Sequence, residues 1–130
     1  MPTQVRIIRA TEFLIVTATG EIDFERSQRL LGKVASAWTA PGPHETLLDM
    51  RETHSALSAT DVWNLAVGLS RHATPFHGKM AVLCRANAGG QADFFALCAQ
   101  NRGFPVRAFS SFEDAIDWLV EGGPVLEETV

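Results

Sequence analysis

The sequence predicts a single α/β domain over residues 1–130, built on a mixed five-stranded sheet with four helices in the order β-β-α-β-α-β-α-β-α. Three observations support this fold class. Short runs of β-branched and other apolar residues alternate with longer segments whose apolar residues recur at helical spacing. The first two runs are close enough to form a hairpin. A chain of 130 residues, 46% of them hydrophobic, is long enough for one packed core but not for two.

The opening elements are a strand pair and a helix. Residues 5–9 and 13–19 are rich in β-branched residues and are separated by a short link, which favours an antiparallel hairpin. Gly20 is expected to end the second strand. Asp23 is a favourable N-cap for the first helix, and the Pro-Gly-Pro segment at residues 41–43 ends that helix.

The middle of the chain predicts a strand, a loop and a second helix. Residues 46–50 have the composition of a short buried strand, and residues 51–57 are expected to form a loop. Ser58 is the predicted N-cap of the helix that follows. Asp61 places a negative charge near the positive end of the helix dipole, which stabilises that end.

The last part of the chain repeats the alternation. The expected elements are a strand buried on both faces, a helix, a strand and a final helix, at residues 79–84, 91–101, 104–109 and from Ser110 or Ser111 onward. Ser110 and Glu113 have the spacing of a capping box. Residues 121–130 are expected to form a loose tail.

Composition and charge exclude several classes of function. The formal charge of −4 argues against a nucleic-acid partner, which requires a basic face. No apolar run approaches the roughly 18 residues of a membrane span, and no signal peptide is recognisable, so the expected location is the cytoplasm. Cys84 and Cys98 fall in apolar runs at a spacing that matches no zinc or redox motif. Both are expected to be free, mostly buried thiols.

No metal site, cofactor or catalytic group is predicted. The four histidines lack ligand spacing, and no GxGxxG or Walker pattern indicates a nucleotide cofactor. No local signature supports a Ser/His/Asp or Cys/His arrangement. Asp49, at the end of a strand, is expected to tether the following loop by accepting hydrogen bonds from backbone amides.

The order of these elements resembles the STAS fold of anti-sigma-factor antagonists, and more closely the divergent SpoIIAA-like group. The resemblance spans roughly residues 5–120. The segments that carry it are residues 18–23, 47–49, 79–83, 106–109 and 112–119. It implies a cytoplasmic bacterial protein that acts by binding, with small-ligand or lipid binding in some members.

The resemblance also implies a place for regulation, and the sequence departs from the family there. Classical antagonists carry Asp-Ser-Ser-Gly after the third strand, and a partner kinase phosphorylates one serine. Here residues 56–59 lack both the Asp and the Gly. Ser55 and Ser58 lie where the family is modified, and a helix N-terminus would stabilise a phosphate. The alternative is that Ser58 serves only as a helix cap, with Asp61 repelling any added phosphate.

Two polar segments follow neighbouring parallel strands. They are expected to meet at the carboxyl ends of the strands, where open α/β sheets bind ligands. The candidate contact residues are Arg51, His54, Ser55 and Ser58 in the first segment and Arg85, Asn87, Gly89 and Gly90 in the second. The glycines could form an anion-binding nest to which Arg85 adds charge. The alternative is a flexible connection whose polar side chains are solvated.

Phe94 and Phe95 are the candidate interface residues. Adjacent residues on a helix point about 100° apart, so both rings cannot face the sheet. One ring is expected either to line a pocket or an interface, such as that of a homodimer, or to lie under the helix edge. The sequence therefore indicates a non-enzymatic regulatory module that binds a protein partner or a small apolar, lipid-like ligand. The alternative is a small enzyme of unknown reaction that uses the crevice between residues 51–58 and 85–90.

Overall fold

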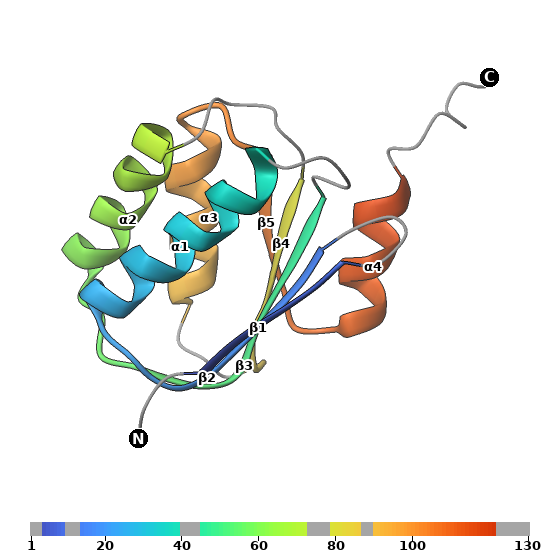
Figure 1. Ribbon diagram of the computed structural model, residues 1–130, viewed down its shortest axis with the longest axis horizontal. Coiled ribbons are helices and arrows are strands. Elements are labelled where there is room, and N and C mark those ends of the chain that lie inside the picture. The colour runs from blue at the N-terminus through green and yellow to red at the C-terminus, as the bar shows by residue number, and fades with distance from the viewer. Residues whose placement is uncertain (1–3, 10–13, 40–44, 73–78, 87–89, 122–130) are drawn as a thin grey trace.

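The computed structural model describes residues 4–9, 14–39, 45–72, 79–86 and 90–121 (Figure 1). The strands are β1 (Gln4–Arg9), β2 (Leu14–Ile22), β3 (Thr46–Ser55), β4 (Met80–Leu83) and β5 (Val106–Phe109). The helices are α1 (Phe24–Thr39), α2 (Ala59–His72), α3 (Gln91–Gln100) and α4 (Phe112–Glu121). The expected alternation of strands and helices is therefore present. The predicted hairpin link, the segment after α1 and the tail beyond residue 121 lie outside the described residues.

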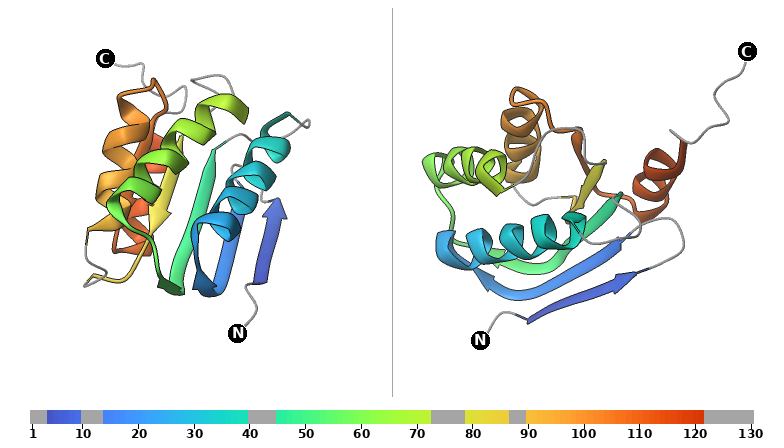
Figure 2. Two further views of the ribbon diagram at one scale, coloured as in Figure 1. Left: turned by 90° about the vertical axis from the view of Figure 1, so that its left-hand side faces the viewer. Right: turned by 45° about the horizontal axis from the view of Figure 1, so that its top comes forward.

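The sheet has the strand order β1-β2-β3-β4-β5, in which β2 to β5 are parallel and β1 pairs antiparallel with β2. Crossovers between parallel strands are right-handed, and here each new strand is added on the same side of the last. The three crossover helices α1, α2 and α3 therefore cover one face of the sheet, as Figure 2 shows. Helix α4 follows the last strand and packs on the opposite face, against β3, β4 and β5.

The main core lies between the sheet and α1, α2 and α3. Alternate residues of β2 point into it because successive side chains of a strand face opposite sides. Leu14, Val16 and Ala18 are fully buried there. A smaller cluster under α4 joins Leu47 of β3 to Leu119 of α4. The larger core and the three helices around it position the pocket described below.

Two strands are longer than the sequence predicted. Residues 51–55 continue β3 instead of forming a loop, and β2 continues past Gly20 to Ile22. These extensions pair with each other, with Gly20 opposite Thr53 and Ile22 opposite Ser55. Gly20 has a φ of 96°, which L-residues rarely adopt. The glycine therefore permits an irregular backbone within the strand and does not end it.

A β-bulge explains why the second half of β3 does not follow the pattern of the first half. Between Asp49 and Glu52, β3 holds one residue more than β2 does opposite it. Because side chains alternate between faces, one extra residue reverses the facing of every residue that follows. Thr53 and Ser55 consequently face the helices. The hydroxyl of Thr53 donates a 2.7 Å hydrogen bond to the carbonyl of Met50, which ties the bulge together.

Side chains cap the first two helices as the sequence predicted. The Asp23 carboxylate accepts a 2.8 Å hydrogen bond from the amide of Arg26 at the start of α1. At α2 the hydroxyl of Ser58 accepts from the amide of Asp61 at 3.0 Å, and the Asp61 carboxylate accepts from the amide of Ser58 at 3.1 Å. This reciprocal pair is a capping box with Asp in place of the usual Glu or Gln.

The cap of α4 differs from the expected capping box. The hydroxyl of Ser111 accepts a 3.3 Å hydrogen bond from the amide of Asp114, so Ser111 is the N-cap. The spacing of Ser110 and Glu113 had predicted a capping box that begins one residue before the observed cap. A one-residue shift moves the helix start, and Ser110 stays exposed between β5 and α4.

Candidate functional site

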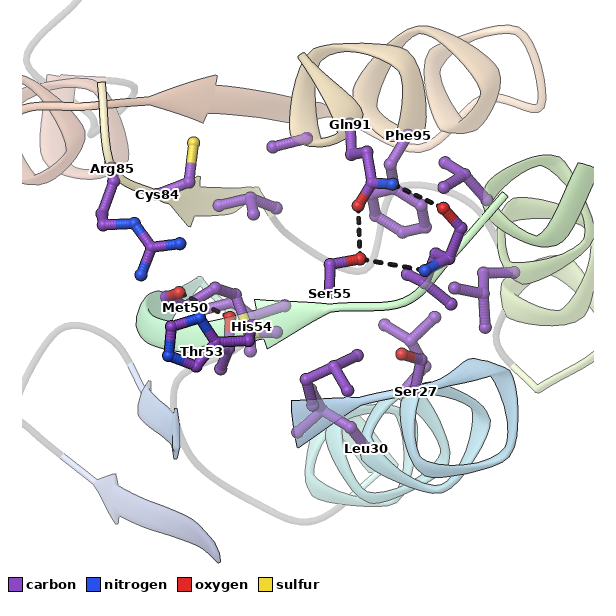
Figure 3. Close-up of a pocket in the computed structure, with 18 residues that line it drawn as sticks. Ser27, Leu30, Met50, Thr53, His54, Ser55, Cys84, Arg85, Gln91 and Phe95 are labelled. Carbon is purple, nitrogen blue, oxygen red and sulfur yellow. Dashed lines mark hydrogen bonds between the residues drawn. The ribbon is translucent and has the colours of Figure 1, made fainter. Parts of the chain in front are cut away.

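A pocket of about 510 Å³ lies between the sheet and the three helices of its main face (Figure 3). It exists because neighbouring strands have different lengths. β4 pairs with β3 only as far as Leu83 opposite Asp49, whereas β3 continues beside β2 to Ser55. The helices next to that extension therefore lack a full sheet beneath them. The pocket lies at the carboxyl ends of the parallel strands, where open α/β sheets bind ligands.

The walls of the pocket are mainly apolar. Each of the three helices contributes side chains from its N-terminal half, and the strands supply the floor. The helical residues are Leu30 and Leu31 of α1, Val62 and Leu65 of α2, and Ala92 and Phe95 of α3. Leu48 and Met50 of β3 lie beneath them. A lining of this kind favours a ligand whose body is apolar.

Three hydrogen bonds hold one wall together. The hydroxyl of Ser55 donates to Oε1 of Gln91, and Nε2 of Gln91 donates to the carbonyl of Leu57 at 2.7 Å. The amide of Leu57 donates to Ser55 Oγ at 3.2 Å, which closes the ring. The end of β3, the segment before α2 and the first residue of α3 are thereby joined. Their polar groups are mutually satisfied, so this wall is a preformed structure.

Ser27 of α1 is the exception among the buried polar side chains. The residue is 5% exposed and lines the pocket. Among the described residues, its Oγ is the buried side-chain nitrogen or oxygen that has no hydrogen-bond partner. Figure 3 shows its hydroxyl at the pocket surface of α1. Leaving a buried hydroxyl unpaired costs free energy, so this atom is a ready contact for a polar atom inside the pocket.

Arg51 lies on the other side of β3, and its side chain forms an ion pair with Asp49. Its Nη2 and Nε donate to the two carboxylate oxygens at 2.8 and 3.0 Å, and its amide donates to Oδ1 at 3.1 Å. Burial raises the pKa of Asp49, but the hydrogen bonds and charge of Arg51 outweigh burial and leave that pKa below its ordinary value. Asp49 thus accepts one backbone amide, as expected, but the segment it holds is the continuation of β3 and not a loop. Arg51 is not part of the lining.

Arg85 is placed differently. It follows β4, lines the pocket, and donates one hydrogen bond of 3.0 Å from Nη1 to the carbonyl of Arg51. Within the described part of the chain it forms no ion pair with a carboxylate. A guanidinium carries five N–H donors, so donors remain for a ligand. His54 is the second basic side chain of the lining.

Both cysteines are free, as expected. Cys98 is buried in α3, but Cys84 is only half-buried, because it stands at the end of β4 and lines the pocket. Its thiol contacts the carbonyl of Phe109 at 3.6 Å. Burial, together with the nearby negative charge of Asp93, raises the pKa of Cys84. This thiol is therefore protonated at neutral pH and is a weak nucleophile.

The pocket brings together some of the predicted contact residues and not others. His54, Ser55, Arg85 and Phe95 line it. Ser58 instead caps α2 and Arg51 binds Asp49, while Gly90 precedes α3 with a φ of 80°. Asn87 and Gly89 lie outside the described residues.

The rings of Phe94 and Phe95 differ in exposure, as expected for adjacent residues on a helix. Phe95 is 8% exposed and lines the pocket, which is one of the two places expected for one of these rings, so Phe95 is not an exposed interface residue of this chain. Phe94 is 38% exposed and is still available for contact.

Sequence reasoning missed Ser27, although a signal existed. Ser27 stands three and four residues before Leu30 and Leu31, so it is a polar residue on the apolar face of a predicted helix.

Neither a metal site nor a membrane span is found in the part of the chain that the structure describes. There, no group of three or more histidine, cysteine, aspartate or glutamate side chains is placed to hold a metal ion. No described helix is both long and apolar enough to cross a membrane.

Comparison with solved structures shows the fold. No family model matches this sequence, and no curated protein matches it. A protein of the DUF3478 family from Shewanella loihica, described as having a SpoIIAA-like fold, is 21% identical with a TM-score of 0.55. The match covers 90% of this chain and 93% of that one.

Two further structures agree. An anti-sigma-factor antagonist from Mycobacterium paratuberculosis is 17% identical with a TM-score of 0.59, over 91% of this chain and 94% of that one. The anti-sigma-factor antagonist SpoIIAA in its unphosphorylated form is 17% identical with a TM-score of 0.57, over 94% and 98% of the two chains. The protein therefore has the SpoIIAA-like α/β fold of anti-sigma-factor antagonists, with a strongly diverged sequence.

Proposed function

We propose that this protein is a non-enzymatic binding module that holds a small, mostly apolar molecule in the pocket between its sheet and helices. The observation that carries the proposal is a pocket of about 510 Å³ with apolar side chains from three helices. That volume lies within the range of about 300 to 1,000 Å³ of small-molecule sites, which combine apolar walls with a few polar groups.

The polar groups of the pocket support binding better than catalysis. Ser55 is engaged with Gln91, and the thiol of Cys84 has a raised pKa. An enzyme would need a nucleophile beside a base or a pair of titratable groups with divergent pKa values. The described lining presents neither arrangement.

Binding of a neutral fluorescent naphthylamine probe tests the proposal. We expect the probe to increase in fluorescence on binding with a single saturable site. Ala92 lines the pocket, so the Ala92→Trp variant should fill it and abolish probe binding. The matched control is Gln28→Trp, an exposed position of α1 that is not in the lining. Equal binding by wild type and Ala92→Trp, or no binding by the wild type, would overturn the proposal.

A protein partner is the second candidate, and exposed apolar side chains on α2 and α3 favour it. Trp63 and Leu97 are 47% and 53% exposed, and Phe94 stands three residues before Leu97 on the same face of α3. Two of the similar structures are named anti-sigma-factor antagonists, and proteins of that name act on another protein. Regulation through a protein contact at α2 and α3 fits such a role.

Self-association is the form of protein contact that can be tested directly. If α3 is the contact surface, light scattering should show a dimer at high protein concentration, because a small domain most often associates as a symmetric pair. Leu97→Glu should shift the equilibrium to monomer, while Gln28→Glu, which adds the same charge at an exposed position of α1, should not. A wild-type protein that stays monomeric at all concentrations contradicts a homodimer.

A further inference from the structure

Among the described residues, the pocket lining contains basic side chains and no acidic ones. The chain has 15 acidic residues against 11 lysines and arginines, and a formal charge of −4, yet no aspartate or glutamate among the described residues lines the pocket. The charged or basic side chains in the lining are Arg85 and His54. Asp93 acts electrostatically on Cys84 from the first turn of α3, but it is exposed and not part of the lining. A ligand with a positively charged end would therefore meet no counter-charge, whereas an anionic end would meet Arg85.

Arg85 has the free donors that such an anion needs. Two arginines flank this edge of the sheet, and the structure distinguishes them. The charge of Arg51 is neutralised by Asp49, to whose two carboxylate oxygens its guanidinium donates two hydrogen bonds. Arg85 makes one hydrogen bond, to the carbonyl of Arg51, which leaves its charge unneutralised among the described residues and steadies its side chain at the pocket. Guanidinium groups bind carboxylates with paired, charge-assisted hydrogen bonds.

A second polar contact lies away from Arg85. Figure 3 shows Ser27 and Arg85 on opposite sides of the pocket, with Ser55 and apolar side chains between them. Ser27 is 5% exposed and its Oγ has no partner among the described residues. A ligand that reaches from Arg85 across the apolar middle would satisfy this hydroxyl if its far end carried a hydrogen-bonding group.

We propose that the pocket binds an elongated, mostly apolar carboxylic acid, with its carboxylate held by Arg85 and a polar group at its far end hydrogen-bonded to Ser27. This inference rests on the proposed function and specifies its ligand. The apolar body contacts the leucines of α1 and Phe95 of α3, and the two ends are fixed by the two polar side chains.

Three ligands of equal length and different head groups test the carboxylate. We would displace the neutral probe with dodecanoate, dodecanol and dodecylamine, each below its micelle concentration. Dodecanoate should bind about tenfold more tightly than dodecanol, because a charge-assisted hydrogen bond is stronger than a neutral one. Dodecylamine should bind weakest, because its ammonium group would face Arg85 with no carboxylate in the lining.

Substitution of Arg85 identifies the contact. Arg85→Gln should remove the advantage of dodecanoate over dodecanol and leave dodecanol binding unchanged. Arg29→Gln is the control, since it removes the same charge from an exposed position of α1 outside the lining. If dodecanol binds as tightly as dodecanoate, or Arg85→Gln affects both equally, the anionic ligand class is wrong while the proposed function stands. If neither ligand nor the probe binds, the proposed function itself fails.

Substitution of Ser27 tests the far end. A dodecanoate with a terminal hydroxyl should bind the wild type several-fold more tightly than dodecanoate does, a difference on the order of one hydrogen bond. Ser27→Ala should abolish this difference without weakening the binding of dodecanoate. Ser27→Ala should fold normally, because the removed hydroxyl has no partner in the free protein. If the hydroxylated acid has no advantage, or keeps it in Ser27→Ala, the assignment of Ser27 is wrong.

Discussion

Ser58 shows how one residue can be explained by the helix it begins. Its hydroxyl and amide exchange hydrogen bonds with the amide and carboxylate of Asp61, so both partners are used in the cap of α2. Ser58 is not part of the pocket lining. The structure therefore supports the capping interpretation from the sequence, while modification of Ser58 stays a hypothesis.

We predict that Ser58→Ala lowers the free energy of unfolding by about 1 kcal/mol, the typical value of a lost N-cap, and leaves probe binding unchanged. Ser58→Asp, itself a favourable cap, should be close to neutral in both. Thermal melts paired with the probe titration measure the two effects. If Ser58→Asp abolishes binding while Ser58→Ala preserves it, a negative charge at this position is a switch and the capping interpretation is insufficient.

Cys84 provides a pH-dependent probe of the pocket. Burial raises its pKa, and only the thiolate reacts with iodoacetamide. We predict slow alkylation at neutral pH, with a midpoint above that of an ordinary thiol and with protection by bound ligand. Because the raised pKa disfavours the thiolate in the folded state, Cys84 contributes stability below the ordinary thiol pKa, and this contribution falls as pH rises.

Mass spectrometry locates the alkylated residue, and Cys84→Ser is the control that should eliminate labelling of the folded protein. Cys98 is buried in α3 and should react only on unfolding. Faster labelling of Cys98 than of Cys84, or a rate at Cys84 indifferent to bound ligand, would contradict the position of the Cys84 thiol in the pocket.

At the scale of elements, the order along the chain was predictable, but the end of β3 was not. Periodicity identified the four helices because each buries a continuous apolar stripe. Residues 51–55 lacked a strand pattern because the bulge inserts one residue and the extension pairs with β2 alone. Gly20 obscured the matching extension of β2, since a glycine among β-branched residues resembles a strand end.

We predict that the hydrogen bond from Thr53 to the carbonyl of Met50 stabilises the bulge. Thr53→Val keeps the shape of the side chain but removes the donor, so it should lower the free energy of unfolding by about 1 kcal/mol. Probe binding should weaken, because Ser55 follows in the same segment. Thr17→Val, half-buried on the opposite side of β2, is the control and should be nearly neutral. Chemical denaturation of both variants gives the comparison, and equal losses would contradict a special role of Thr53.

At the scale of the whole molecule, the sequence indicated where a pocket would lie but not all of the residues that line it. The rule that ligands bind at the carboxyl ends of parallel strands led to His54, Ser55 and Arg85, which the structure places in the pocket lining. Their contact with a ligand stays a prediction. Ser27 and Gln91 come from helices. Ser27 could have been noticed as a polar residue on the apolar face of α1, but the approach of both residues to the strands depends on packing that no local sequence pattern specifies. Arg51 was predicted as a contact residue because it is close in sequence to His54 and Ser55. Its side chain lies on the other face of β3, where it binds Asp49.

Because the pocket lies inside the main core, its occupancy should be coupled to global stability. A ligand that binds only the folded state stabilises it by about 2.7 kcal/mol when its concentration is a hundredfold above Kd. We predict that the naphthylamine probe raises the unfolding midpoint by several degrees and that the rise grows with probe concentration. Circular dichroism at a helix wavelength measures the shift. Ala92→Trp should show no rise, and a rise of equal size in that variant would indicate binding elsewhere.

The difference in length between β3 and β4 has a consequence for how such a domain can diversify. The four residues of β4 and most of the core are fixed by packing on both sides of the sheet, while the segment after β4 carries Cys84 and Arg85 at the pocket edge. Under the proposed function, substitutions in that segment should alter the head group that the pocket recognises and leave the residues that stabilise the fold unchanged. The residues at the pocket edge and the residues of the core are therefore largely separate, which is consistent with a fold that this chain shares with solved structures at 15 to 21% identity.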